Sequence, residues 1–418
     1  MTALPTTVEH AVPANVLARD YAMRDKVTLW IAPDGPKRVE VTLSGQFDNK
    51  SPDERKACNL LGHSDFDFRY SADLDLAAER QALMDNFQNL YDPNSRIGTL
   101  LRQENLQKLS GLQLRTALMP FARQGWNVFN HLFCLLNDLQ GVTAKRVPIV
   151  RNALVSLVRR PQVITVHSNV PLFPWNFLYS DAPNEAKISS LELGRFWGFH
   201  HEVQQRLKGT SDSIVLRSES RVVAAICSAT DKGRHDEDDH PFRKFSAQVR
   251  RIQSCAELAT LLRAFDHECL YFYGHANHKR PPVQSESWLS LCEIKLYVSS
   301  LLPPDHPQFL NELVVAFLNG CRMAQLDDWD DKTIIGYLCH CSGNRLCCVA
   351  PVAEVPESFA ADFAEHVWTR FLIERKPIGT ALVDARNATL NEWNNPLGLL
   401  YSLFGRVDTH IPAVTESR

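Results

Sequence analysis

The C-terminal half of the chain alternates between short apolar runs rich in β-branched and aromatic residues and longer amphipathic stretches. The apolar runs predict buried strands and the amphipathic stretches predict helices. Strands that alternate with helices indicate a parallel sheet covered by helices on both faces, and such sheets carry their chemistry at the carboxyl ends of the strands. The predicted strands are 221–227, 269–273, 312–318 and 345–350, and the predicted helices are about 246–264, about 331–341 and 357–374.

The N-terminal half has a less regular pattern. A hairpin is predicted from the strands Val27–Ile31 and Val39–Leu43, which flank a Pro-Asp-Gly-Pro turn. A helix-rich region and a buried strand follow, then a proline-broken aromatic segment, a second helical stretch and a polar connector. The helix-rich region is 73–139, with Leu83, Phe87 and Leu90 on one helical face and Leu132, Leu135, Leu136 and Leu139 on another. The buried strand is 161–166, the proline-broken aromatic segment is 170–179, the second helical stretch is 191–207 and the polar connector is 209–220. The connector divides the chain into predicted domains 1–210 and 215–418.

Length and composition describe a folded globular protein. The 418 residues are 44% hydrophobic, and 45 basic and 48 acidic side chains give a formal charge of −3. This balance favours neither nucleic acid nor an acidic membrane surface as a direct partner. The 11 cysteines suit a reducing compartment, and neither a leader nor a membrane span stands out in the sequence, so a cytoplasmic protein is predicted.

Two predicted strands end in residues that form a catalytic pair in cysteine proteases. CLYFY runs into Gly274 and His275, and ELVVAFL runs through Asn319 and Gly320 into Cys321. A thiol is nucleophilic as thiolate, and a neighbouring imidazole supplies the base. Either residue alone is more often a satisfied histidine or a buried thiol. Together they form a candidate dyad, because the 46-residue spacing is close to the roughly 50 residues of the caspase arrangement.

Several further segments, in order along the chain, give the sequence its resemblance to the CHAT family of caspase-like cysteine proteases. They are PLFPWNFLY, YFYGHAN, the strand pair near 288–296, VVAFLNGC, CCVAPVAEVPE, KPIGTALVDARNATL and YSLFG. The resemblance implies an α/β caspase-like fold, with a mostly parallel sheet and helices on both faces, preceded by an α/β pseudo-protease half. It also implies a His275–Cys321 dyad that needs neither metal nor cofactor.

The resemblance further implies an oxyanion hole formed by the backbone amides of Ala276 and Cys321. The family often has glycine after the histidine, where this chain has Ala276. The N-terminal half has no paired Gly-His and Gly-Cys at strand ends, which is why it is assigned as a pseudo-protease or scaffold half. His63, in Leu-Gly-His-Ser, is the residue of this half whose sequence context most resembles that of the catalytic histidine.

An acidic run follows the candidate nucleophile and comprises Asp327, Asp328, Asp330 and Asp331. Carboxylates at this position could bind a basic substrate side chain. The alternative is a solvated loop before a helix, where aspartates cap the helix and favour its dipole.

Other candidate sites have weaker support. Cys339, Cys341, Cys347 and Cys348 do not have the usual paired zinc-ligand spacing and are interpreted as buried thiols. The charged run 231–244 is interpreted as a surface loop. The chain contains neither a phosphate-binding GxxxxGK[ST] loop nor a strand-linked GxGxxG, which disfavours nucleotide hydrolysis and dinucleotide chemistry.

Three functions remain open on sequence grounds. The leading one is an endopeptidase that cleaves a specific protein partner. The resemblance places it in bacterial antiphage or programmed-death pathways, with a gasdermin-like or CRISPR-linked substrate and a separate sensor or activator chain. The second is a catalytically silent CHAT scaffold that binds a partner through the same cleft, and the third is acyl transfer other than proteolysis.

Overall fold

The computed structural model describes most of the chain, with gaps. The described residues are 26–35, 37–46, 52, 55–57, 66–90, 98–99, 109–135, 138–139, 147–168, 173–206, 215–216, 221–226, 240–245, 249–252, 254–263, 267–277, 287–291, 294–297, 310, 312–320, 323, 333–343 and 345–412.

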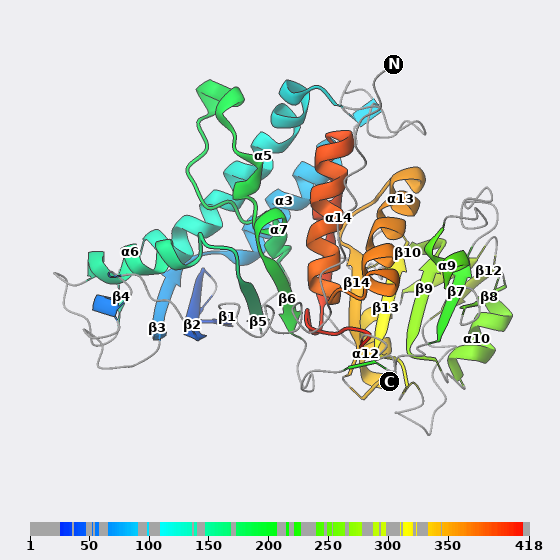
Figure 1. Cartoon of the computed structure of the whole chain (residues 1–418). Helices are drawn as coiled ribbons and strands as arrows, with labels where there is room; N and C mark the ends of the chain where they lie inside the picture. Colours follow the sequence, from blue (N-terminus) through cyan, green and yellow to red (C-terminus); the bar gives the residue numbers. More distant parts are fainter. Residues whose placement is uncertain are drawn as a thin grey trace, which may run out of the picture.

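A 12-stranded sheet runs through the whole molecule in the order β4-β3-β2-β1-β5-β6-β15-β14-β13-β9-β7-β8 (Figure 1). Its strands are β1 Lys26–Pro33, β2 Arg38–Gln46, β3 Phe66–Asp73, β4 Asp138–Leu139, β5 Val163–Ser168, β6 Glu202–Arg206, β7 Val222–Ile226, β8 Val249–Ile252, β9 Cys269–Tyr273, β13 Val315–Asn319, β14 Cys347–Pro351 and β15 Tyr401–Phe404. Seven of the eleven pairings among these described strands are parallel. The predicted α/β class with a large, mostly parallel sheet is confirmed.

A second sheet and the helices complete the architecture. The small antiparallel sheet consists of β10 His275–Asn277, β11 Trp288–Leu291 and β12 Ile294–Tyr297. The α-helices are α3 Leu76–Leu90, α5 Gly111–Phe129, α6 Val147–Leu157, α7 Trp197–His200, α9 Pro241–Lys244, α10 Cys255–Arg263, α12 Ile334–Cys341, α13 Glu357–Trp368 and α14 Ile378–Trp393. Short 3-10 segments lie at Trp175–Phe177, Glu185–Ser190, Leu193–Arg195 and Leu397–Leu400, and π turns extend α5 and α13 through Asn130–Cys134 and Thr369–Ile373.

The predicted hairpin is present, and its burial pattern follows its sequence. Val27, Leu29 and Ile31 of β1 are buried, whereas the residues between them face the other side of the sheet. The turn contains Gly35 at φ +106°, a conformation that favours glycine. In Figure 1 the helices α3, α5 and α6 all lie on one side of these first strands.

The strands at the centre of the second half are buried on both faces. Every residue of β7, β9, β13 and β14 is buried, as expected of parallel strands that are covered on both sides. The four predicted strands of this half are confirmed, and so are the helices near 331–341 and 357–374. The strand pair predicted near 288–296 forms β11 and β12.

Three predictions of local structure are wrong. The predicted helical stretch 191–207 ends in the strand β6, because its backbone is paired on both sides, with β5 and with β15. The predicted helix 246–264 begins with the strand β8, which pairs with β7, and only then continues as α10. The described leucines of the predicted face at 132–139 do not lie on one helix: Leu132 is buried in the π turn, Leu135 is 46% exposed, and Leu139 lies in β4, while Leu136 is outside the described residues. In the first two cases tertiary pairing overrides a local pattern.

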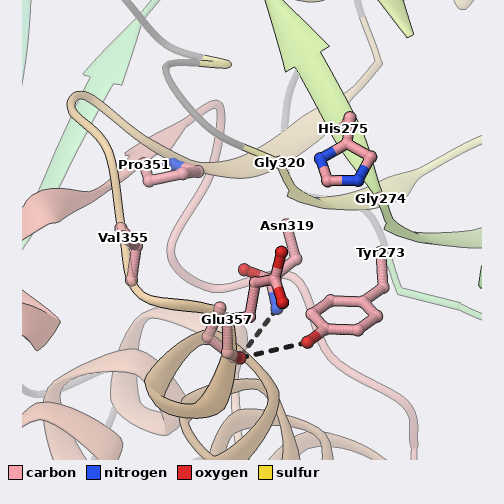
Figure 2. Close-up of a pocket in the computed structure, with 9 residues that line it drawn as sticks. Tyr273, Gly274, His275, Asn319, Gly320, Pro351, Val355 and Glu357 are labelled. Carbon is pink, nitrogen blue, oxygen red and sulfur yellow. Dashed lines mark hydrogen bonds between the residues drawn. The ribbon is translucent and has the colours of Figure 1, made fainter. Parts of the chain in front are cut away.

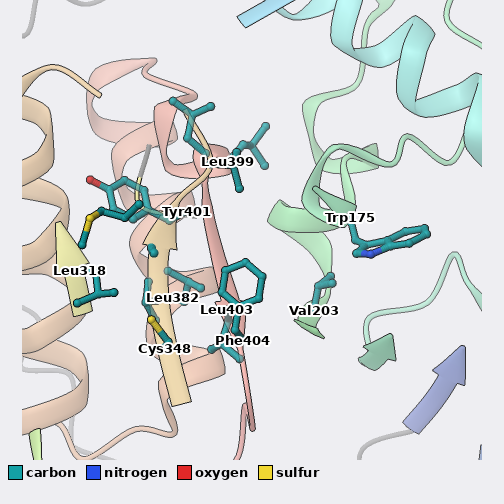
Figure 3. Close-up of a cluster of buried hydrophobic side chains, with 14 of the residues drawn as sticks. Trp175, Val203, Leu318, Cys348, Leu382, Leu399, Tyr401, Leu403 and Phe404 are labelled. Carbon is teal, nitrogen blue, oxygen red and sulfur yellow. The ribbon is translucent and has the colours of Figure 1, made fainter. Parts of the chain in front are cut away.

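The two halves of the sequence share one continuous core (Figure 3). The strand β15, near the end of the chain, pairs with β6 of the first half, and Val203, Leu403 and Phe404 are buried at this junction. Arg386 of α14 is buried and donates hydrogen bonds to the carbonyls of Gly198 (2.9 Å), Gly398 (3.2 Å) and Tyr401 (2.6 Å). The division at 210–215 stays a prediction about sequence organisation. Among the described residues, no helix is both long enough and apolar enough to span a membrane.

Candidate active site

The site forms where two neighbouring parallel strands end. Tyr273, the last residue of β9, lies opposite Asn319, the last residue of β13, so the glycines that follow them lie side by side. A Cβ on Gly320 would lie 3.0 Å from the Cβ of Ala276 and 3.2 Å from the carbonyl oxygen of Gly274. Glycine at 320 therefore allows the chain after β13 to approach the chain after β9 closely.

Gly274 turns the chain out of the main sheet. Directly after it, β10 pairs with β11, and His275 lies opposite Ser290. A Cβ on Gly274 would lie 2.7 Å from the carbonyl oxygen of Ser290, closer than real Cβ contacts. The absence of a side chain at 274 lets the small sheet join the carboxyl end of β9, and this junction leaves His275 exposed to solvent.

A small pocket, about 30 Å³ in volume, lies beside His275 (Figure 2). Its walls come from the ends of β9, β13 and β14 and from the start of α13. The lining residues are Tyr273, Gly274, His275, Asn319, Gly320, Pro351, Val355, Glu357 and Ala360. The volume is enough for a water molecule or the tip of a side chain, so a peptide would lie across the opening and not inside the pocket.

Asn319 fixes the floor of this pocket. Its buried side-chain amide donates to the carbonyl of Ala360 (2.7 Å) and to the hydroxyl of Tyr271 (3.2 Å), and its oxygen accepts from the hydroxyl of Tyr401 (2.6 Å). These bonds tie the end of β13 to α13, β9 and β15. The backbone immediately before Gly320 is therefore held by packed elements on three sides, which is how a functional site gains rigidity.

Glu357 is the one acidic side chain among the described residues that line the pocket. It is the first residue of α13 and is exposed, and Figure 2 shows it beside Asn319 at the floor of the pocket. Its backbone carbonyl accepts a hydrogen bond of 3.1 Å from the hydroxyl of Tyr273. The pocket thus combines an imidazole, a carboxylate and apolar walls.

The structure brings some of the predicted site residues together. His275 and Ala276 are adjacent in β10, next to Gly320. Cys321 and the acidic residues Asp327, Asp328, Asp330 and Asp331 lie outside the described residues, and so does His63. The dyad and the oxyanion assignments therefore stay predictions.

The sequence alone did not predict the residues that support the pocket. Asn319 had a detectable signal, because an amide at the end of an otherwise apolar strand must find partners in the fold. Glu357 lies within the segment CCVAPVAEVPE but had no distinguishing spacing. Tyr401 is 82 residues beyond Asn319 in the chain, and only the fold brings its hydroxyl to the side chain of Asn319.

The described cysteines other than Cys134 are buried. Burial raises the pKa of Cys347 to about 12 and also raises the pKa values of Cys339 and Cys348, so these thiols stay protonated at neutral pH. Within the described part of the chain, no group of three or more His, Cys, Asp or Glu side chains is arranged to hold a metal ion.

Comparison with known proteins gives similarities to a curated protein and to a solved structure. No protein-family model matches the chain. A probable protease of Vitiosangium sp. (strain GDMCC 1.1324) is 24% identical over 252 residues, which cover 55% of this chain and 32% of that protein. The chain thus spans about a third of the length of this curated relative. Among solved structures, the separase–securin complex of Saccharomyces cerevisiae gives a TM-score of 0.48 at 10% identity, covering 95% of this chain and 31% of that chain.

Proposed function

We propose that the protein is a cysteine endopeptidase in which His275 and Cys321 form the catalytic dyad. The observation that carries the proposal is the meeting of Gly274 and Gly320 at adjoining strand ends, with the His275 side chain exposed above the pocket. Cys321 follows Gly320 directly in the sequence. The similarity to a protein named a probable protease supports the same class of activity.

In the proposed reaction, His275 takes the proton of the Cys321 thiol, and the thiolate attacks the carbonyl carbon of the scissile peptide bond. The backbone amides of Ala276 and Cys321 stabilise the oxyanion. The intermediate collapses to a thioester as His275 donates the proton to the leaving amine. A water molecule, deprotonated by His275, then hydrolyses the thioester and restores the thiol.

The pocket suggests a preference for a basic substrate side chain. Glu357 contributes a carboxylate to a lining that is otherwise mostly apolar or uncharged, and a guanidinium or ammonium group beside it would gain a charge-assisted hydrogen bond. Asp327, Asp328, Asp330 and Asp331 are likewise proposed to favour a basic substrate side chain. Unlike them, Glu357 is a described residue, and it lines the pocket.

The CHAT resemblance suggests the setting. We propose a cytoplasmic enzyme that cleaves one protein partner in an antiphage or programmed-death pathway, under the control of a separate sensor or activator chain. Silent binding of a partner through the same cleft is the competing function, and acyl transfer by the same dyad is a third.

The test compares the parent with Cys321→Ala and His275→Ala, each co-expressed with the products of neighbouring genes, and detects cleavage by mass spectrometry. Both variants are expected to lose at least about a thousandfold in cleavage rate. Cys134→Ala is the matched control, because Cys134 is the only described cysteine that is not buried. Cleavage at the parental rate by Cys321→Ala would disprove the dyad, and partner binding without cleavage by any form would favour the scaffold.

Labelling with iodoacetamide provides an independent measurement. Cys321 is expected to react first among the 11 thiols. His275→Ala should slow that reaction at pH 7 without changing the labelling of Cys134. Equal reactivity of Cys321 with and without His275 would contradict the proposed pair.

A further inference from the structure

A row of side chains crosses the first half of the main sheet on the face away from α3 and α5. The strand registers place Arg206, His167, Trp30, Thr42 and Arg69 directly opposite one another on β6, β5, β1, β2 and β3. Residues that lie opposite each other in adjacent strands share a face of the sheet. The row therefore presents a basic group, two aromatic rings, a hydroxyl and a second basic group on one surface.

Trp30 is the most unusual member of this row. Its side chain alternates with the buried Val27, Leu29 and Ile31 and is 50% exposed. The indole stacks on the imidazole of His167, with 3.7 Å between ring centroids and 7° between planes. Burial and the neighbouring Arg206 lower the pKa of His167 to about 4, so the imidazole is neutral at pH 7 and supports the indole as an aromatic ring.

Two hollows flank this stacked pair. The larger, about 460 Å³, lies over β1 to β3 and is lined by Trp30, Thr42, Glu40 and Arg69 among others. The guanidinium of Arg69 pairs with the carboxylate of Glu40, which holds it in place at the wall. The hollow thus has an indole at one end and a planar guanidinium at the other, and both groups stack on aromatic ligands.

The smaller hollow, about 200 Å³, shares His167 with the larger one and is more strongly basic. It is lined by Lys26, Arg206 and Arg406, with Asp408 as the one acidic residue. Asp408 accepts a hydrogen bond of 2.8 Å from Nε of Arg406, so this pair is mutually neutralised. The lining thus carries three basic side chains and one acidic side chain, a composition that favours an anionic group.

The spacing between these features is compatible with a small molecule that carries an aromatic ring and an anionic group. Adjacent strands lie about 4.8 Å apart, so Trp30 and Arg206, two strands apart, are separated by roughly 10 Å across the sheet. This is the reach of a nucleotide from its base to its outer phosphate. A larger hollow with aromatic walls and a smaller basic one, joined at His167, have the shapes and charges that a base and its phosphates require.

We propose that this face of the sheet is a nucleotide-binding site, in which the base stacks on Trp30 and the phosphates bind at Arg206 and Lys26. The site is distinct from the pocket at His275, and its ligand is bound without a chemical step. The smaller hollow includes residues that follow β15, and Tyr401 at the other end of that strand bonds to Asn319 of the pocket at His275.

Calorimetric titration of the full chain with ADP, GDP, adenosine and pyrophosphate tests the proposal without any protease readout. ADP or GDP is expected to bind with a dissociation constant below about 1 mM, and more tightly than adenosine or pyrophosphate. Trp30→Ala should weaken binding at least about fivefold, whereas Trp30→Phe keeps a stacking surface and should retain most of the affinity. Arg206→Gln should reduce the affinity for ADP to that for adenosine.

The control is Arg250→Gln, which removes an exposed arginine of the edge strand β8 that pairs with Glu257. It should bind ADP as the parent does. Thermal unfolding of every variant shows whether it is folded. Absence of saturable binding by any nucleotide, unchanged binding by a folded Trp30→Ala, or equal affinity for pyrophosphate and ADP would overturn the proposal. Much tighter binding of a single-stranded oligonucleotide than of ADP would also overturn the proposal, because the site would then bind a nucleic acid and not a free nucleotide.

Discussion

The hydroxyl of Tyr401 donates a hydrogen bond of 2.6 Å to the side-chain oxygen of Asn319. Tyr401 begins β15, which pairs with β6 of the first half, and Asn319 ends β13 at the candidate active site. This bond therefore connects the pocket to the strand that joins the two halves of the sheet. It belongs to a buried network in which the Asn319 amide also bonds to Tyr271 and Ala360.

A double-mutant cycle on this pair should show strong coupling. Tyr401→Phe removes one buried hydrogen bond and should reduce the free energy of unfolding by about 1 kcal/mol. Asn319→Ala removes the partner of three buried groups and should cost about 3 kcal/mol. The coupling energy from urea denaturation should be at least about 0.5 kcal/mol, and additive effects would show that the two residues act independently.

Gly274→Ala should destabilise the protein, because its Cβ would lie 2.7 Å from a backbone oxygen that cannot move without disturbing β11. The expected loss in the free energy of unfolding is about 1–3 kcal/mol. Gly194→Ala is the matched control, since a Cβ there has no heavy atom within 4 Å, and its effect should stay within about 0.5 kcal/mol. Equal losses in the two variants would contradict the close approach at Gly274.

Glu357→Gln tests the charge of the pocket. If the proposed protease accepts a basic side chain there, kcat/KM for peptides with arginine or lysine at the cleavage site should fall about tenfold or more. Peptides with a neutral residue at that position should be cleaved at nearly the parental rate. Glu354→Gln is the control, because Glu354 is exposed and is not among the residues that line the pocket. An equal loss for both peptide classes would assign Glu357 a structural role.

His201 should make folding stability sensitive to mild acid. The side chain is 1% exposed, and burial followed by the neighbouring His200 lowers its pKa well below 6.5. Below pH 6.5 the His201 imidazole therefore binds a proton in the unfolded chain but not in the folded state. The free energy of unfolding falls as pH falls, by up to about 1.4 kcal/mol per pH unit.

Urea denaturation at pH 7.5 and pH 5.5 measures this effect. His201→Phe should reduce the acid-induced loss relative to the parent. His167 and His366, whose pKa values are also lowered mainly by burial, contribute in the same direction in both proteins and cancel in the difference. An unchanged slope in His201→Phe would contradict the assignment.

Local sequence patterns predict a strand correctly where both of its faces are buried, or where buried and exposed residues alternate along it. Residues 269–273 form β9 over the predicted span, and Val27–Ile31 lies within β1, because an apolar run or a two-residue alternation is itself the signature of a covered or half-covered strand. Glu202–Arg206 was misassigned because its residues are mostly polar, and its strand conformation comes from pairing with β5 and β15.

By itself, the sequence determined the fold class, the two strand ends that meet at the candidate site, and the glycines that let them approach. These features depend on short segments whose residues constrain their own conformation. Only the tertiary structure decided that Tyr401 and Glu357 join Asn319 at the pocket, and that Arg206, His167, Trp30, Thr42 and Arg69 form one row. Such contacts join residues far apart in the chain, and they depend on strand order and register, which no local pattern encodes.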